Sequence, residues 1–230
     1  MTNKVKVTAL LISLETNDHA PVAYINPNKY IQHNLMVGDG LAAFGDLMKH
    51  RPPGGFKAKV IRAFQDGDYV FTHTEYDFFG PKVGFDIFRF EDGLIVEHWD
   101  NLQETVTATK SGHSMTDGPA TACDLDKTAI NKAFIKSFYD EVLLGHQHDK
   151  VTKYISTEKF VQHNPGVGDG LTGFKEAMAE MAKAGLTMEM RNVHLILGEG
   201  DFVLGQSEGV FAGKEVTFYD LFRIENGKIT

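Results

Sequence analysis

The sequence has one cysteine, Cys123, among its 230 residues. No disulfide can form within the chain, which suits a reducing compartment, and we expect a cytoplasmic protein. Basic residues are also few, 23 against 31 acidic ones, for a net charge of −8. Nucleic acids and anionic membranes attract basic patches, so neither is expected as a partner.

Long apolar runs and cofactor motifs are lacking as well. No apolar stretch is long enough to span a bilayer. Val7–Leu14 follows two lysines as in a short signal peptide, but Glu15 ends it and no small-residue cleavage site follows. There is no phosphate-binding loop, dinucleotide fingerprint, nucleophile elbow or zinc-type histidine spacing. We therefore expect neither a cofactor nor a metal.

What the chain does have is one stretch that occurs twice. Residues 30–44 read YIQHNLMVGDGLAAF and residues 160–174 read FVQHNPGVGDGLTGF, with nine identical positions. A second pair follows in the same order: FDIFRFEDGLI at 85–95 and YDLFRIENGKI at 219–229. Motifs that recur in order about 130 residues apart predict a duplicated domain with a core in each copy.

In each copy, the apolar residues first recur at the helical spacing of about 3.6 and then at every second position. Helices followed by strands predict an α+β fold. The helices predicted are Asn3–Glu15, Leu41–His50, Asp126–Leu144 and Leu171–Ala184. The strands, rich in β-branched and aromatic residues, are Phe56–Phe64, Tyr69–Tyr76, Lys82–Phe90, Leu94–Leu102, Met188–Leu197, Asp201–Gly209 and Glu215–Ile224, with an incomplete last strand.

The predicted domains are residues 1–108 and 126–230, joined by a linker at residues 109–125. The linker contains SGHSMTDGP, which is polar and has no hydrophobic period. The second copy stops at Thr230, before any counterpart of His98 and Asp100. We therefore expect a chemically complete pocket only in the first domain.

The motifs YIQHN, GDGL and FDIFRFEDGLIVEHWDN resemble the SnoaL-like polyketide-cyclase branch of the nuclear-transport-factor-2-like (NTF2-like) superfamily. The resemblance covers nearly the whole chain, as a tandem-domain protein. It implies two tandem cone-shaped domains, each with N-terminal helices packed on a curved antiparallel sheet and a pocket between. Members commonly pair sheet to sheet, which implies a pseudo-dimer within the chain and allows a homo-oligomer. The superfamily hosts several reactions, so the fold alone does not fix one.

Asp86 is a candidate oxyanion donor. It shares a strand face with Phe88 and Phe90, where desolvation disfavours a charged carboxylate. We expect it to be protonated near neutral pH unless His33 or His98 pairs with it. A protonated carboxyl can donate to a developing oxyanion, the role that a resemblance to ketosteroid isomerases implies. The alternative is a structural carboxyl bonded to nearby backbone.

Two further places could hold an acid or base. His33 is one, because imidazole titrates near neutral pH, although Gln-His-Asn could instead tie down the loop. His98 and Asp100 share a face of their strand, with Trp99 on the other face. Resemblance to polyketide cyclases points to Asp100 as acid or base. The alternative is that His98 and Asp100 form a structural ion pair or hydrogen bond at the end of the strand. The tyrosine that isomerases carry on the first helix is absent, with Leu10 and Phe138 in its place.

The sequence thus predicts a cofactor-independent enzyme of SnoaL type that removes a proton next to a carbonyl, leading to aldol cyclisation or isomerisation. The candidate catalytic residues are His33, Asp86, His98 and Asp100. The candidate ligand-binding residues are His73, Phe88, Phe90, Trp99, His163 and Asp220. The expected ligand is small, apolar and carbonyl-bearing. The alternative is a non-catalytic ligand-binding or interaction protein on the same fold.

Overall fold

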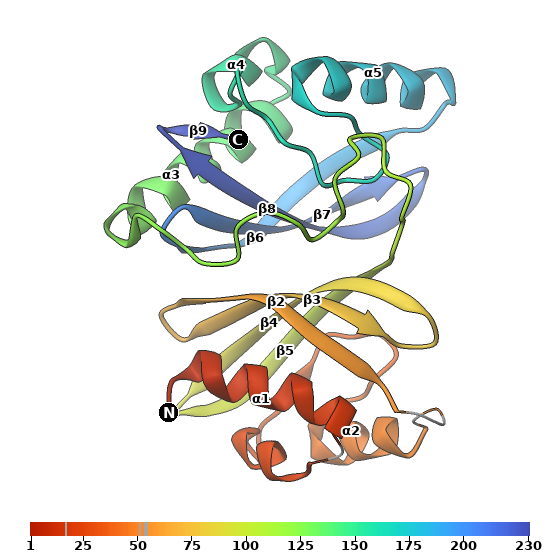
Figure 1. The fold of residues 1–230 in the computed structure, drawn as a ribbon, viewed down its shortest axis with the longest axis vertical. Coiled ribbons are helices and arrows are strands. Elements are labelled where there is room, and N and C mark those ends of the chain that lie inside the picture. The colour runs from red at the N-terminus through yellow and green to blue at the C-terminus, as the bar shows by residue number, and fades with distance from the viewer. Residues whose placement is uncertain (17, 51, 53–54) are drawn as a thin grey trace. The chain divides into compact units, whose positions relative to one another are not determined.

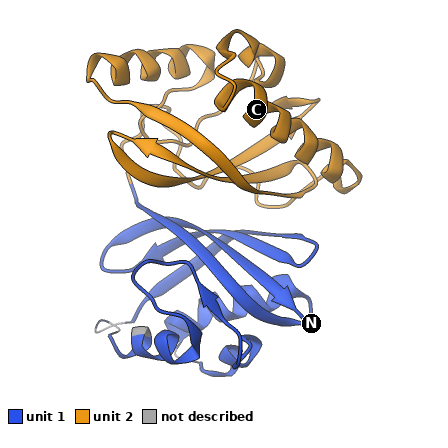
Figure 2. Cartoon of the chain, turned by 180° about the vertical axis from the view of Figure 1, so that it is seen from behind, with its two compact units in different colours: residues 1–105 blue, residues 106–230 orange. Residues whose placement is uncertain are grey.

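The chain forms two compact units, Met1–Thr105 and Val106–Thr230, in a computed structural model that describes residues 1–16, 18–50, 52 and 55–230 (Figure 2). Each unit has its own helices and its own sheet, so both are α+β as predicted (Figure 1). Within these described ranges, no helix has the length and apolar character needed to cross a membrane.

The first unit places two helices before its main strands. They are α1 (Asn3–Thr16) and α2 (Gly40–Lys49), with a 3-10 turn at Ala20–Tyr24 between them. Its strands, in the spatial order β1-β5-β4-β3-β2, are β1 (Ile31–Gln32), β2 (Lys57–Asp66), β3 (Tyr69–Asp77), β4 (Pro81–Glu91) and β5 (Leu94–Glu104). The pairs from β2 to β5 are antiparallel, whereas β1 runs parallel to β5. Strand β1 was not predicted from the sequence, because two residues are too few to show a period.

One face of this sheet carries both the core and a set of polar side chains. The register places Thr72 of β3 opposite Asp86 of β4, and Asp86 opposite Asp100 of β5. Residues directly opposite in antiparallel strands project from the same face, so these three side chains are neighbours. The same face packs against helix α1, in a core that includes Val7, Leu10, Leu11, Leu14, Val70, Phe88, Phe90 and Ile95. Asp86 therefore lies between the sheet and the helices.

The second unit repeats this plan. Its helices are α3 (Thr128–Phe138), which continues as a π-helical turn at Tyr139–Leu143, α4 (Val151–Tyr154) and α5 (Gly170–Lys183). Its strands, adjacent in chain order, are β6 (Met188–Glu199), β7 (Phe202–Phe211), β8 (Lys214–Glu225) and β9 (Lys228–Ile229). Short 3-10 turns at Leu125–Lys127 and His148–Lys150 complete its described elements. In Figure 1 the helices of this unit cover one face of its sheet.

The repeated sequence motif makes the same hydrogen bonds in both units. The backbone N–H of Gln32 donates to Asp39 over 2.7 Å, and that of Gln162 donates to Asp169 over 2.7 Å. The glycine after each aspartate has a left-handed φ, +82° or +71°, which a residue with a side chain rarely adopts. The Gly-Asp-Gly sequence is thus used twice for one local turn.

The linker packs on the second unit. The backbone N–H of Lys110 donates to the carbonyl oxygen of Pro165 over 3.0 Å. Further along, the N–H of Cys123 donates to the carboxylate of Asp201, whose own N–H returns a bond to the Cys123 carbonyl. The whole of the predicted linker, residues 109–125, therefore belongs to the second unit, which begins at Val106.

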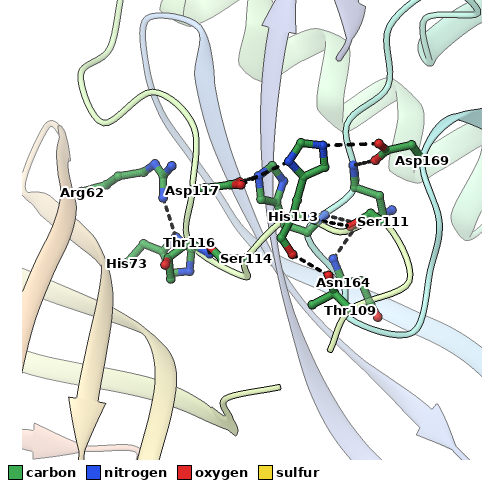
Figure 3. Close-up of polar contacts among 12 residues, drawn as sticks. Arg62, His73, Thr109, Ser111, His113, Ser114, Thr116, Asp117, Asn164 and Asp169 are labelled. Carbon is green, nitrogen blue, oxygen red and sulfur yellow. Dashed lines mark hydrogen bonds and ion pairs between the residues drawn. The ribbon is translucent and has the colours of Figure 1, made fainter. Parts of the chain in front are cut away.

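Side chains hold the middle of the linker in place. His113 lies between two carboxylates, with Nδ1 3.1 Å from Asp117 and Nε2 3.4 Å from Asp169 (Figure 3). The other oxygen of Asp117 lies 2.6 Å from His163 Nε2. Burial acts to raise the pKa of Asp117, but the hydrogen bonds from both histidines outweigh it and the pKa is lowered. The linker is thus bonded at two points, His163 and Asp169, to the repeated motif of this unit.

Candidate functional site

A buried hydrogen-bond network surrounds Asp86 in the first unit. One carboxyl oxygen lies 3.1 Å from His98 Nε2. The other accepts from the hydroxyls of Tyr76, at 2.6 Å, and Thr72, at 3.2 Å. Asp86 and His98 are only 4% and 8% exposed. The sequence predicted a protonated Asp86 unless a histidine paired with it, and the structure has that histidine, on the neighbouring strand.

Asp100 lies beside this pair. Asn34 donates its side-chain amide to both oxygens of Asp100, at 2.9 and 2.7 Å. Burial raises the pKa of Asp100; the nearby Asp86 adds to this, while His98 and Asn34 oppose it. Ligand atoms of Asp86, His98 and Asp100 all lie within 4.8 Å of one another. The structure therefore brings together three of the residues singled out in the sequence.

Two tyrosine hydroxyls adjoin the carboxylates. Burial raises the pKa of Tyr76, and the charge of Asp86 raises it further. Burial also raises the pKa of Tyr30, with added effects from Asp100 and Asp86. Ionisation of either phenol would place another negative charge beside the carboxylates, so both hydroxyls stay protonated and can donate hydrogen bonds.

The spacing of Asp86, His98 and Asp100 would allow a metal ion, but their atoms already have other uses. Asp86 uses both oxygens and His98 both ring nitrogens in hydrogen bonds. Both oxygens of Asp100 accept from Asn34. The arrangement in the structure is that of a hydrogen-bonded acid–base network.

Three predicted site residues lie on the opposite face of the sheet. His33 pairs with Glu97 over 2.8 Å, and its ring stacks on Trp99 with 4.6 Å between centroids. His73 stacks on Phe85 with centroids 4.4 Å apart, and the register places these two side chains opposite each other. Because side chains alternate along a strand, His33, Trp99 and His73 project away from the buried carboxyl.

The two predicted aromatic residues of β4 do lie on the site face. Phe88 stacks on the ring of His98, with centroids 4.4 Å apart and planes inclined by 22°. Phe90 is buried in the core against helix α1. Phe88 therefore limits the movement of the His98 ring, and Phe90 belongs to the packing behind it.

Asp220 holds the matching strand position in the second unit but has a different partner. The hydroxyl of Tyr139 donates to Asp220 over 3.1 Å. Burial raises the pKa of Asp220 to about 6, although this hydrogen bond lowers it. Gly205, opposite Asp220, leaves the necessary space, since a side chain there would collide with the tyrosine hydroxyl.

Tyr139 corrects one expectation from the sequence. The sequence predicts Phe138 at the place of the helix tyrosine, but it is the next residue, Tyr139, whose hydroxyl reaches the carboxyl. The helix widens into a π-helical turn at Tyr139, and such a turn shifts which side chain faces the core. The predicted residue His163 is elsewhere in this unit, bonded to Asp117 of the linker.

Sequence reasoning missed several members of the first-unit network: Tyr30, Gln32, Asn34, Thr72 and Tyr76. A signal for two of them was present. Gln and Asn flank His33 in a motif that occurs twice, and alternation predicts that they face away from the histidine. Only the central histidine was weighed as functional. For Tyr76, the cross-strand register was needed, and the sequence does not state it.

Comparison with known proteins gives structural neighbours only. No protein-family model matches the chain, and no curated protein matches it. An NTF2-like protein of unknown function from Cytophaga hutchinsonii is 17% identical, with a TM-score of 0.40 over 45% of this chain and 91% of that one. IdmH of Streptomyces antibioticus, a candidate polyketide cyclase, is 19% identical, with a TM-score of 0.34 over 43% and 89%.

A third similar structure is an epoxide hydrolase of the LEH-like kind from M. tuberculosis, which is 22% identical, with a TM-score of 0.37 over 44% of this chain and 81% of that one. Each of these three structures matches less than half of this chain. The two units are defined by their own strand order and register.

Proposed function

We propose that the first unit is a small-molecule enzyme that removes a proton next to a carbonyl group without a cofactor, and that each unit is a cone-shaped domain of SnoaL type. One observation carries the proposal: Asp100, with a raised pKa, lies beside a buried Asp86–His98 pair. A base and a proton donor within a few ångströms are what enolisation requires.

Asp100 is the base in this scheme. It is half-buried, whereas Asp86 and His98 are nearly inaccessible. A carboxylate whose pKa is raised is a stronger base than a solvated one, and the Asn34 amide keeps it oriented. His33, the other base weighed from the sequence, is left out because it projects from the opposite face.

The oxyanion that forms on the carbonyl oxygen needs hydrogen-bond donors. The Tyr30 hydroxyl, which accepts from Gln32, can donate to it directly. The proton between Asp86 and His98 is a second source once the ligand oxygen replaces one partner of that hydrogen bond. After Asp100 takes the proton from carbon, the enolate carbon can attack a second carbonyl in the same ligand, and the resulting alkoxide takes the proton back from Asp100; this is aldol cyclisation. Alternatively, Asp100 returns the proton to a different carbon, which is isomerisation. The ligand class is the one expected from the sequence, small, apolar and carbonyl-bearing.

The proposal can be tested with a substituted phenol, whose phenolate oxygen resembles an enolate. Asp100→Asn removes a negative charge next to the phenolate, so we expect about tenfold tighter binding. Asp86→Ala removes part of the donor network, so we expect binding to weaken by about 2–4 kcal/mol, while Asp86→Asn weakens it only modestly. Calorimetric titration at several pH values measures all three.

The enzyme proposal predicts opposite changes in phenol affinity, an increase for Asp100→Asn and a decrease for Asp86→Ala. A protein that only binds apolar ligands would lose affinity slightly, or not at all, with either substitution. Asp220→Asn is the matched control, because it changes the equivalent carboxyl in the other unit. If it alters phenol binding as much as the Asp100 substitution does, the assignment to the first unit is wrong.

A further inference from the structure

We propose that Gln32 and Asn34 are positioning residues that fix where the protons of this site reside. Gln32 holds His98 with a proton on Nδ1, and Asn34 keeps an N–H donor directed at Asp100. The catalytic consequence rests on the proposed function, but the placement of the protons does not.

The orientation of both amides is fixed by the backbone. The N–H of Asn34 donates to the Gln32 side-chain oxygen over 3.0 Å. The N–H of Met36 donates to the Asn34 side-chain oxygen over 2.8 Å. A backbone N–H can only donate, so each accepting atom must be the amide oxygen. The remaining NH₂ groups then point to Tyr30 and Asp100, respectively.

This orientation determines the state of His98. Its Nδ1 lies 3.1 Å from the same Gln32 oxygen, which cannot donate. Nδ1 must therefore carry a proton, and the neutral form protonated only on Nε2 is excluded. Nε2 faces an oxygen of Asp86 at 3.1 Å, so the two groups share one proton. Either His98 is an imidazolium beside a carboxylate, or it is neutral and accepts from a protonated Asp86.

The other oxygen of Asp86 is already an acceptor for two hydroxyls, from Thr72 and Tyr76. The shared proton therefore lies between Asp86 and His98, whose ligand atoms are within 4.8 Å of those of Asp100. Phe88 stacks on the imidazole and resists its rotation. A proton is thus held near the base, and the Gln32 oxygen keeps the protonated Nδ1 turned toward itself.

The second unit supplies a natural comparison. Gln162 accepts from the backbone N–H of Asn164 over 2.8 Å, and Asn164 accepts from Gly166 over 3.0 Å. The local turn is therefore the same. Gln162 also accepts from the backbone N–H of His163 over 2.9 Å, so its oxygen serves backbone groups. The turn of the second unit thus forms with backbone donors alone. The contact between Gln32 and the His98 imidazole in the first unit is therefore not needed to form the turn.

The test is ¹⁵N NMR of the full chain labelled at histidine, with His98→Gln used to assign the His98 signals. We expect an Nδ1-bound proton at every pH at which the protein is folded. Gln32→Glu keeps the acceptor but adds a charge beside the ring, so the midpoint pH of the His98 titration should rise by about 1 unit. Gln162→Glu, the matched control, should leave the His98 signals unchanged.

A neutral His98 protonated on Nε2 would overturn the proposal. So would a Gln32→Glu variant whose His98 titration moves no more than that of Gln162→Glu. Asn34→Asp provides the second arm: it replaces the donor with a second carboxyl, so Asp100 should take up a proton at a higher pH in ¹³C carboxyl spectra, whereas Asn164→Asp should not change Asp100. None of these readouts needs turnover, so they separate this proposal from the proposed reaction.

Discussion

Asp86 and Asp220 occupy equivalent strand positions and have different chemistry. Asp86 is paired with His98 and accepts from two hydroxyls. Asp220 has one neutral donor, Tyr139, and burial dominates its pKa. Cross-strand neighbours, rather than the residue itself, decide which hydrogen-bond partners a buried carboxyl has.

Asp220 should make the stability of the protein depend on pH. Its folded-state pKa of about 6 lies above the ordinary value of 3.8, so the folded unit binds this proton more tightly than the unfolded chain does. The stabilisation is complete below the ordinary value and is lost as the pH rises through about 6. A difference of two pKa units corresponds to about 2–3 kcal/mol.

Asp220→Asn removes this titration and can still accept from Tyr139. Urea unfolding at pH 4, 5.5 and 7 measures the effect. The free energy of unfolding of the parent should fall by about 2 kcal/mol relative to the variant over this range. Parallel pH profiles for the two proteins would show that the Asp220 carboxyl has an ordinary affinity for its proton.

At the level of elements, the loop with the repeated motif has a different partner in each unit. In the first unit His33 bonds to Glu97 of strand β5, and β1 pairs with β5. In the second, His163 bonds to Asp117 of the linker. In the second unit, the linker thus takes the place that strand β5 has in the first unit, as the partner of the repeated-motif loop.

Asp117→Asn should loosen the linker. It replaces a carboxylate by an amide in two partly exposed hydrogen bonds, to His113 and His163, each weakened by roughly 0.5 kcal/mol, so opening of the linker should become about fivefold more frequent. Trypsin cleavage after Lys110, followed by mass spectrometry under native conditions, reports that opening. Asp124→Asn changes a nearby carboxylate whose partner is Lys127 and serves as the control. Equal cleavage rates in the two variants would show that Asp117 does not hold the linker in place.

The helices and main strands could be predicted because their periods are long, and bounds such as Asn3–Thr16 and Leu94–Glu104 fall within a few residues of expectation. Alternation also predicted that Asp86 shares a face of its strand with Phe88 and Phe90, and that His98 and Asp100 share a face of theirs, but not that these faces coincide. Strand β1, the π-helical turn and the partners of Asp86 could not be predicted. They depend on register between segments far apart in the sequence, or on a local distortion, and neither leaves a periodic signal.

At the scale of the whole molecule, the chain divides into two units at Thr105. The sequence placed the second domain at residue 126, but Cys123 is bonded to Asp201, its N–H to the carboxylate and its carbonyl oxygen to the Asp201 N–H. A fragment 106–230 should therefore fold and melt at a higher temperature than 126–230, which lacks the linker. Circular dichroism on heating measures both. If the shorter fragment melts at the same temperature, the linker contributes nothing to that unit.

The central claim is that Asp100 removes a proton next to a carbonyl. Its most direct test is the exchange of such protons for deuterium in D₂O, followed by NMR for a panel of apolar cyclic ketones. The account predicts exchange faster than in buffer for at least one ketone, reduced about 10²–10⁴-fold by Asp100→Asn and unchanged by Asp220→Asn. Exchange at the buffer rate for the whole panel, or acceleration that survives in the Asp100→Asn variant, would contradict it.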